Sequence, residues 1–184
     1  MAANRLSSSQ GDKYLLLKSD AGFVDRLQAL MHAMEYCKLH GRILCVDWTD
    51  KVWGIDFNEI FEILDYNTIT LEELLNKNIT SVYPIGWKYQ LDRKTSGDHI
   101  RQNLYYINLK LDMKYEETII VFCGLGIRNH DSIKCNNIRI KIPYRNIIIN
   151  KIKEYSDYNK IIHIRKTDRQ DNVKQNQFIN NLQN

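Results

Sequence analysis

Charged and polar residues follow an apolar run late in the chain, in the order His163-Ile164-Arg165-Lys166-Thr167-Asp168-Arg169. The apolar run predicts a strand over Lys160–Arg165, and its period-two alternation places His163 and Arg165 on one face near the carboxyl end. Ligands of open α/β sheets bind at that edge. An arginine there can hold a diphosphate with two parallel hydrogen bonds, with Lys166 adding charge. The alternative is a charged strand end in a solvated turn.

A second pattern lies near the start of the chain, where Ser19–Leu27 contains Gly22 and Arg26 just before a helical periodicity. Apolar residues recur at helical spacing over Val24–His40, and Gly41 stands where a helix commonly ends. We expect Gly22 and Arg26 to line a cleft beside this helix. The alternative for this block is an ordinary strand-helix-strand core with surface charges at the helix start.

The elements that would position these residues alternate between strand and helix. Short apolar runs predict strands at Lys13–Lys18 and Arg42–Trp48 on either side of the Val24–His40 helix, which makes a right-handed βαβ unit with a parallel sheet. Further strands are predicted at 81–85, 117–122 and 139–142, and further helices at 56–64, 70–75 and 143–158. Thr70 and Glu73 have the spacing of a capping box. The fold class is therefore α/β, with an open parallel sheet flanked by helices, and residues 88–112 are left unassigned.

Other residues that could carry chemistry form weaker patterns. Gly124-Leu125-Gly126 lacks the third glycine of a phosphate-binding loop and is interpreted as a turn at the cleft edge. Trp48 is expected in the core. The four cysteines and five histidines are dispersed, which predicts buried free thiols and no metal site.

Length and composition limit the classes of protein that are compatible. A chain of 184 residues fits one domain, or one domain and the beginning of another. The net charge of +4 comes from 26 basic and 22 acidic residues, too even a mixture to favour a nucleic-acid partner. No apolar run is long enough to cross a bilayer and the start has no apolar signal core, so we expect no membrane association and a cytoplasmic protein.

The late motif resembles the His-x-Arg-Arg-Thr-Asp motif of nodulation-factor and α-1,6-type fucosyltransferases. His163, Arg165, Thr167 and Asp168 match it, and Lys166 stands where those enzymes have a second arginine. The early block also resembles the family, in a Gly-rich turn, an Asp-Arg-Leu helix start and, after the helix, a Gly-Arg strand that ends in Asp-Trp. In this block Val24 replaces a glycine that the family usually has.

The resemblance implies a Rossmann-like lobe, the N-terminal half of a two-lobed glycosyltransferase that uses GDP-fucose without a metal or other cofactor. It implies the lobe at 13–159 and the first strand of a second lobe within 160–184. The polar, Ser-rich first residues predict a flexible leader at 1–12, and the Asn- and Gln-rich end of 160–184 predicts a polar tail. The residues that would contact the donor diphosphate are His163, Arg165, Lys166 and Asp168. The acceptor would be a glycan, and no catalytic residue or oligomeric state is assigned.

Because the family builds its donor site mainly in the second lobe, we expect the 184 residues to be inactive alone. Two other functions stay open from the sequence. One is a non-catalytic module that binds a glycan or a nucleotide, and the other is an unrelated structural α/β domain.

Overall fold

The computed structural model describes residues 11–19, 21–49, 54–95, 104–124 and 136–154. These residues fall into two compact units that divide between Tyr144 and Arg145, and each unit is described by itself. The predicted leader at 1–12 therefore lies almost entirely outside the described residues, and the predicted strand Lys160–Arg165 lies entirely outside them.

The first unit is built on a five-stranded sheet in the order β4-β2-β1-β6-β5, with every neighbouring pair parallel. The strands are β1 (Tyr14–Lys18), β2 (Ile43–Asp47), β4 (Thr68–Ile69), β5 (Val82–Tyr83) and β6 (Ile119–Phe122). The central strand β1 pairs with β2 on one side and β6 on the other. All five of its residues are buried, as its unbroken apolar run predicts for a parallel strand covered on both faces.

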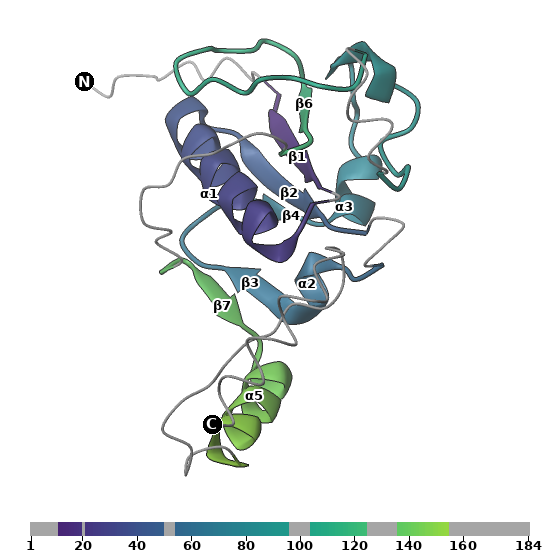
Figure 1. The fold of residues 1–184 in the computed structure, drawn as a ribbon. Coiled ribbons are helices and arrows are strands. Elements are labelled where there is room, and N and C mark those ends of the chain that lie inside the picture. The colour runs from purple at the N-terminus through teal and green to yellow at the C-terminus, as the bar shows by residue number, and fades with distance from the viewer. Residues whose placement is uncertain (1–10, 20, 50–53, 96–103, 125–135, 155–184) are drawn as a thin grey trace, which may run out of the picture. The chain divides into compact units, whose positions relative to one another are not determined.

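Helix α1 (Phe23–His40) covers one face of this sheet, in front of β1 and β2 in Figure 1. Its apolar stripe, which includes Leu30, Ala33 and Met34, packs on the side chains of Leu15 and Leu17. The helix ends at Gly41, whose φ of 61° and bond to the Cys37 carbonyl form a left-handed C-cap. The βαβ unit predicted from the sequence is confirmed, with β1 and β2 parallel and α1 between them.

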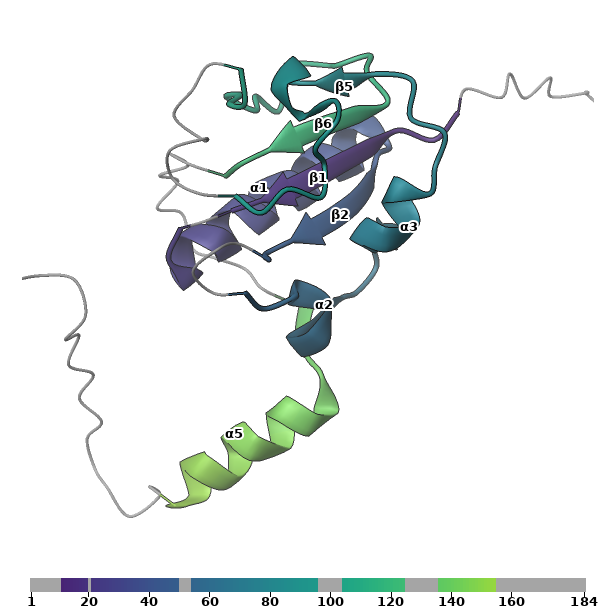
Figure 2. The same cartoon turned by 90° about the vertical axis from the view of Figure 1, so that its right-hand side faces the viewer.

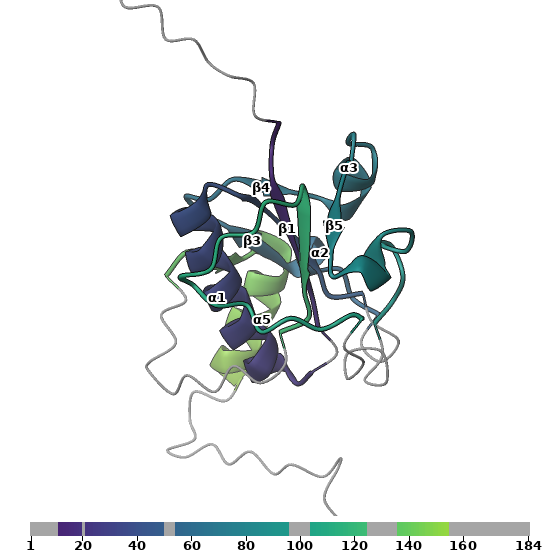
Figure 3. The ribbon, with the colours of Figure 1, turned by 90° about the horizontal axis from the view of Figure 1, so that it is seen from above.

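The opposite face of the sheet is covered by α3 (Leu71–Leu75) and the short 3-10 helix η1 (Ile85–Trp87), as Figures 2 and 3 show. Leu74 and Trp87 pack there with residues such as Leu16 and Cys45. Helix α3 begins with the predicted capping box, in which Thr70 Oγ1 accepts from Glu73 N at 3.2 Å and Thr70 N donates to Glu73 Oε2 at 2.9 Å. The fold is therefore a sheet with helices on both faces.

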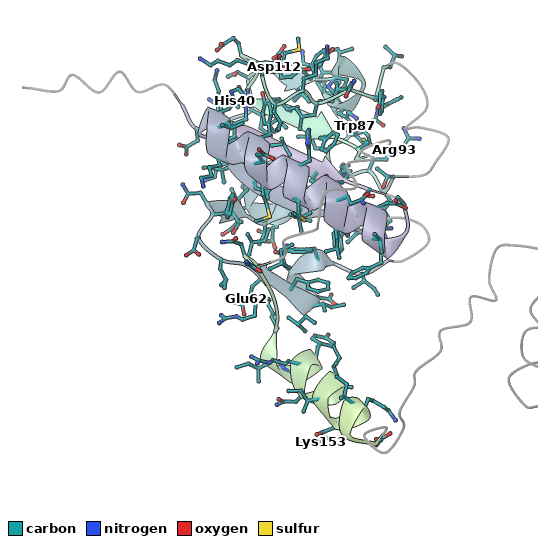
Figure 4. All side chains as sticks on the ribbon, turned by 60° about the vertical axis from the view of Figure 1, so that its left-hand side comes forward. His40, Glu62, Trp87, Arg93, Asp112 and Lys153 are labelled. Carbon is teal, nitrogen blue, oxygen red and sulfur yellow. The ribbon has the colours of Figure 1, made fainter. Side chains whose placement is uncertain are left out.

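The segment 104–113, which the sequence left unassigned, is fastened along α1. Three side chains at four-residue spacing bond its carbonyls: His32 Nε2 to Leu109 at 2.6 Å, Tyr36 Oη to Met113 at 3.0 Å, and His40 Nε2 to Leu111 at 2.8 Å. His40 lies beside this segment near Asp112 in Figure 4. Because residues 104–113 form no strand or helix, their carbonyls have no partners within regular secondary structure, and these side-chain bonds supply partners.

Arg42 closes the amino edge of the sheet. Its buried guanidinium donates to the carbonyls of Tyr14 and Glu117, each at 3.0 Å, and also to that of Tyr115. Burial lowers the pKa of this arginine from its ordinary value. One side chain therefore ties the starts of β1 and β6 to the residue before β2.

Between residues 56 and 69 the structure differs from the prediction in two places. The helix predicted at 56–64 ends after one turn, α2 (Phe57–Ile60), and continues as strand β3 (Phe61–Ile63). Strand β3 pairs antiparallel with β7 (Ile138–Ile140), which was predicted at 139–142. The pairing partner lies more than seventy residues away in the sequence, so tertiary pairing overrides a local helical pattern. Residues 68–69 were also missed as strand β4.

Helix α5 (Ile142–Glu154) begins where Pro143 predicted a helix start. Lys151 and Glu154, three residues apart, form an ion pair of 2.7 Å on it. The predicted end at Tyr158 lies outside the described residues.

Candidate functional site at the carboxyl edge of the sheet

The carboxyl ends of β1, β2 and β6 lie side by side. Lys18 is in register with Asp47, and Leu17 is in register with Phe122, so the three strands end at one level. In open parallel sheets, ligands bind in the crevice outside these ends. The candidate site therefore consists of the turns that follow the three strands, together with the segment that ends at Thr95.

A buried ion pair occupies the centre of this edge. The ammonium of Lys18 contacts a carboxylate oxygen of Asp47, and the side chains are only 1% and 3% exposed. Lys18 Nζ also donates to the Arg93 carbonyl at 3.1 Å and lies 5.5 Å from the centre of the Trp87 ring. Trp87 and Arg93 are labelled beside each other in Figure 4. The Lys18 ammonium is thus paired within the protein, and its contacts with Trp87 and the Arg93 carbonyl hold residues 87–93 against the sheet.

The second carboxylate oxygen of Asp47 fixes the chain after β2. Asp47 Oδ1 accepts from Thr49 N at 2.9 Å and from the Thr49 hydroxyl. A buried carboxylate needs such additional bonds to offset its loss of hydration. Asp47 therefore acts as a brace between β1, β2 and the following turn.

Arg26 lies at the same edge and is buried, with 1% exposure. Its Nε donates to the Ala21 carbonyl at 2.8 Å, its Nη1 donates to the Trp48 carbonyl at 3.2 Å, and the guanidinium lies 5.7 Å from the Trp48 ring centre. Arg26 was expected to line a cleft, whereas the structure shows it joining the turn after β1 to the end of β2. Trp48 is buried, as predicted.

Gly22 is the N-cap of α1 and is exposed at this edge. Its φ of −62° and ψ of 162° are open to any residue, and an added Cβ would meet only Asp25 Oδ2, at 3.4 Å. The first helical bond runs from Arg26 N to the Gly22 carbonyl, so the N–H groups of the first turn have no partner within the helix. The turn therefore directs backbone donors and the positive end of the α1 dipole towards the carboxyl edge.

Gly124, two residues after β6, lies close to helix α1. Its φ is +57°, and an added Cβ would lie 2.5 Å from the Cβ of Ala29 on α1. The turn predicted here from the sequence is thus a position where only glycine fits. Leu125 and Gly126 lie outside the described residues.

The residues predicted to bind the donor diphosphate, His163, Arg165, Lys166 and Asp168, lie outside the described residues, and their role stays a prediction. The Lys18–Asp47 pair was missed, although a signal was present. Each residue ends an apolar run, and two neighbouring parallel strands that end in opposite charges bring those charges into register.

Neither a metal-binding cluster nor a membrane-spanning helix occurs within the described residues. They hold no group of three or more His, Cys, Asp and Glu side chains placed to bind a metal ion. Among the described helices, none combines the length and the apolar character that crossing a membrane requires.

The parallel sheet with helices on both faces is the fold of a Rossmann-like glycosyltransferase lobe. A crystal structure of the fucosyltransferase NodZ from Bradyrhizobium matches it with a TM-score of 0.55 and 18% identity, over 80% of this chain and 58% of that chain. A NodZ α-1,6-fucosyltransferase structure co-crystallized with GDP matches with a TM-score of 0.55 and 16% identity, over 80% and 57%. A NodZ structure soaked with GDP-fucose gives 0.51 and 16%, over 79% and 56%.

At this identity the comparison establishes the fold, and the resemblance stated from the sequence is confirmed at that level. The chain spans little more than half the length of the NodZ structures it matches. No protein-family model matches the sequence. No curated protein matches it either.

Proposed function

We propose that this chain forms one lobe of a fucosyltransferase-like glycosyltransferase whose donor is a nucleotide sugar of the GDP-fucose type. The observation that carries the proposal is the fold match with NodZ over four fifths of the chain. NodZ structures were obtained with GDP and with GDP-fucose, which makes a guanosine diphosphate the first ligand to test.

The arrangement of the carboxyl edge supports a role in placing ligands. Three charged groups at this edge, Lys18, Arg26 and Asp47, are buried and bonded within the protein. They fix the turns after β1 and β2 and the segment at Arg93. The exposed surface of the edge includes the backbone N–H groups of the first α1 turn and the side chains of Arg93 and Lys94. A diphosphate at this edge also needs a cation that can donate two parallel hydrogen bonds.

Arg165 is the residue that we propose for this cation. Its guanidinium offers two parallel donors that match phosphate oxygens, whereas the ammonium of Lys166 is a flexible point charge. Charge-assisted hydrogen bonds contribute about 1.5–3 kcal/mol each, so Arg165→Ala should weaken binding roughly ten- to a hundredfold. Lys166→Ala should weaken it less.

Calorimetric titration of GDP and GDP-fucose into the 184-residue protein tests this proposal. The comparison uses wild type, Arg165→Ala, Lys166→Ala and the control Arg139→Ala, which removes an exposed arginine of β7. We expect binding by wild type and by the control, and a marked loss with Arg165→Ala. Absence of binding by wild type, or unchanged binding by Arg165→Ala, would contradict the assignment.

Transfer of the sugar is expected to need more than these residues. Because the chain spans only 56–58% of the matched NodZ structures, we propose that it lacks groups needed to position donor and acceptor together. A second candidate function is a module that binds a nucleotide sugar or a glycan without catalysis. Turnover of GDP-fucose by the purified 184 residues would exclude that second function.

A further inference from the structure

A groove runs between α1 and the turn that joins β3 to β4, on the side of α1 away from the carboxyl edge. It consists of two adjoining hollows of about 640 and 360 Å³ that share Lys38, Tyr66 and Asn137. The larger one lies within the range of small-molecule sites, which is about 300–1,000 Å³. Its position beside Gly41 and Arg42, which precede β2, separates it from the edge where Lys18 and Asp47 lie.

The lining of the groove combines apolar faces with hydrogen-bonding groups. Met31, Met34 and Leu39 of α1 provide the apolar part, together with the half-buried ring of Tyr66. The polar part consists of carboxylates, amides, one ammonium and one guanidinium: Glu35, Lys38, Asp65, Asn67, Asn137 and Arg42. Within the described residues, the side chains of Glu35, Lys38 and Asn67 make no hydrogen bond or ion pair with the protein.

The turn at the groove is held in a fixed shape. Asp65 has a φ of 63°, the sole positive value among the described residues other than glycine. Asn137 Nδ2 donates to Asp65 Oδ2 at 3.3 Å and to the Leu64 carbonyl at 3.4 Å, and Leu64 N donates to the Asn137 carbonyl at 2.7 Å. Backbone in a sparsely populated region occurs preferentially at binding and active sites. The lining next to Tyr66 is therefore organised before any ligand arrives.

The chemistry of the lining selects one class of ligand. Two carboxylates, Glu35 and Asp65, are balanced by two cations, Lys38 and Arg42, and the Arg42 guanidinium is buried and bonded to carbonyls, so the lining has no net charge that selects an anion. Hydroxyl groups both donate and accept, and they suit carboxylates, amides and an ammonium at once. The C–H face of a sugar ring packs on an aromatic ring and on thioethers. A neutral polyhydroxylated molecule meets all of these requirements.

We infer that this groove is a binding site for a neutral oligosaccharide, separate from the proposed nucleotide-sugar site. The inference rests on the lining residues and the volume of the groove, and it holds whether or not the carboxyl edge binds GDP. The side chains that contact the sugar are those of Glu35, Asn67 and Tyr66, and Asp65 and Asn137 hold the turn in place.

The test is an array of neutral and acidic oligosaccharides probed with the 184-residue protein in the absence of nucleotide, followed by calorimetric titration of the sugar that binds best. The test variant is Glu35→Ala/Asn67→Ala, which changes two exposed residues of the groove. The matched control is Glu72→Ala/Asn78→Ala, which changes two exposed residues at and just after α3, the helix that covers the other face of the sheet. Thermal unfolding of each variant checks that the fold is kept.

We expect a neutral sugar to bind wild type and the control equally, and to bind the groove variant at least tenfold more weakly. The side-chain amide resonances of Asn67 and Asn137 should shift on addition of that sugar. Absence of any neutral oligosaccharide ligand would overturn the inference. So would binding that the groove variant retains, or resonance shifts confined to residues 87–95.

Discussion

Lys18 and Asp47 occupy the same level of two neighbouring parallel strands and form a buried ion pair where both strands end. The pair also anchors the Arg93 carbonyl through Lys18 and the turn at Thr49 through Asp47. Two charges that would individually be unfavourable in the interior thus join three separate chain segments at the candidate site.

Lys18→Met is expected to destabilise the protein strongly, because it leaves the Asp47 carboxylate buried without its partner. The free energy of unfolding should fall by about 3–5 kcal/mol, measured by urea denaturation. Lys18→Met/Asp47→Leu should recover part of this loss, since an apolar pair leaves no charge buried. The control Lys114→Met removes one member of an exposed ion pair of 3.5 Å and should cost less than about 1 kcal/mol. Equal losses for Lys18→Met and the control would contradict the structural role.

Arg42→Lys should also be destabilising, although it keeps the positive charge. A lysine ammonium cannot reproduce the fork that donates to the carbonyls of Tyr14, Glu117 and Tyr115, so at least one buried acceptor loses its partner. We expect the free energy of unfolding to fall by about 2–4 kcal/mol. Arg139→Lys, at an exposed pair with Glu62, serves as the control and should change it by less than about 1 kcal/mol. A near-neutral Arg42→Lys would show that the fork is dispensable.

The local elements of this fold follow from the sequence because their signals are local. The apolar run at Tyr14 to Leu17, the helical spacing from Leu27 to Cys37 and the glycine at 41 each act within a few residues, and the structure confirms all three. The capping box at Thr70 and Glu73 was found for the same reason.

The sequence patterns did not predict contacts between segments that lie far apart in the chain. The segment 104–113 has neither the strand nor the helix periodicity of apolar residues. It is held by side chains of α1 more than seventy residues away, which bond its carbonyls, and no local pattern reveals these bonds. Arg26 carries no signal that distinguishes a buried brace from a cleft residue, because the distinction depends on the Trp48 carbonyl, which only the fold brings near. The diphosphate motif around Arg165 lies outside the described residues and awaits its binding test.

The buried thiols predict a loss of stability at alkaline pH. Burial raises the pKa of Cys37 and of Cys45 to about 12 from an ordinary value of 9.0. A group whose pKa is higher in the folded state than in the unfolded state stabilises the protein fully at pH values below its unfolded-state pKa. This stabilisation is lost as the pH rises towards the folded-state pKa. Between pH 9 and 12 the free energy of unfolding should therefore fall by about 1.4 kcal/mol per pH unit for each thiol.

Urea denaturation at intervals between pH 8 and 11 measures this slope, and Cys37→Ala/Cys45→Ala should make it shallower by the contribution of both thiols. The double variant is expected to be less stable at every pH because it creates cavities, so the comparison uses the slope and not the absolute stability. An unchanged slope would mean that the alkaline loss comes from other groups, such as Tyr36, whose pKa burial also raises.

Gly124 and Gly41 allow backbone strain to be separated from steric overlap. Both have positive φ, of 57° and 61°, but an added Cβ meets nothing within 4 Å at Gly41 and lies 2.5 Å from the Ala29 Cβ at Gly124. Gly41→Ala should therefore cost only the left-handed conformation, about 1–2 kcal/mol. Gly124→Ala should cost about 1–3 kcal/mol more, because the turn after β6 must move away from α1.

A double-mutant cycle with Ala29→Gly identifies the overlap as the cause. Ala29→Gly alone removes the Cβ that would be contacted and costs about 1 kcal/mol as a glycine in a helix. If steric overlap causes the additional loss of stability, Gly124→Ala introduced into the Ala29→Gly variant should cost about the same as Gly41→Ala. The coupling free energy between the two substitutions should then be about 1–3 kcal/mol. Urea denaturation of the four proteins of the cycle, with Gly41→Ala as the fifth, provides the measurement. Additive effects of Gly124→Ala and Ala29→Gly would show that the turn after β6 does not pack against α1 as closely as the structure places it.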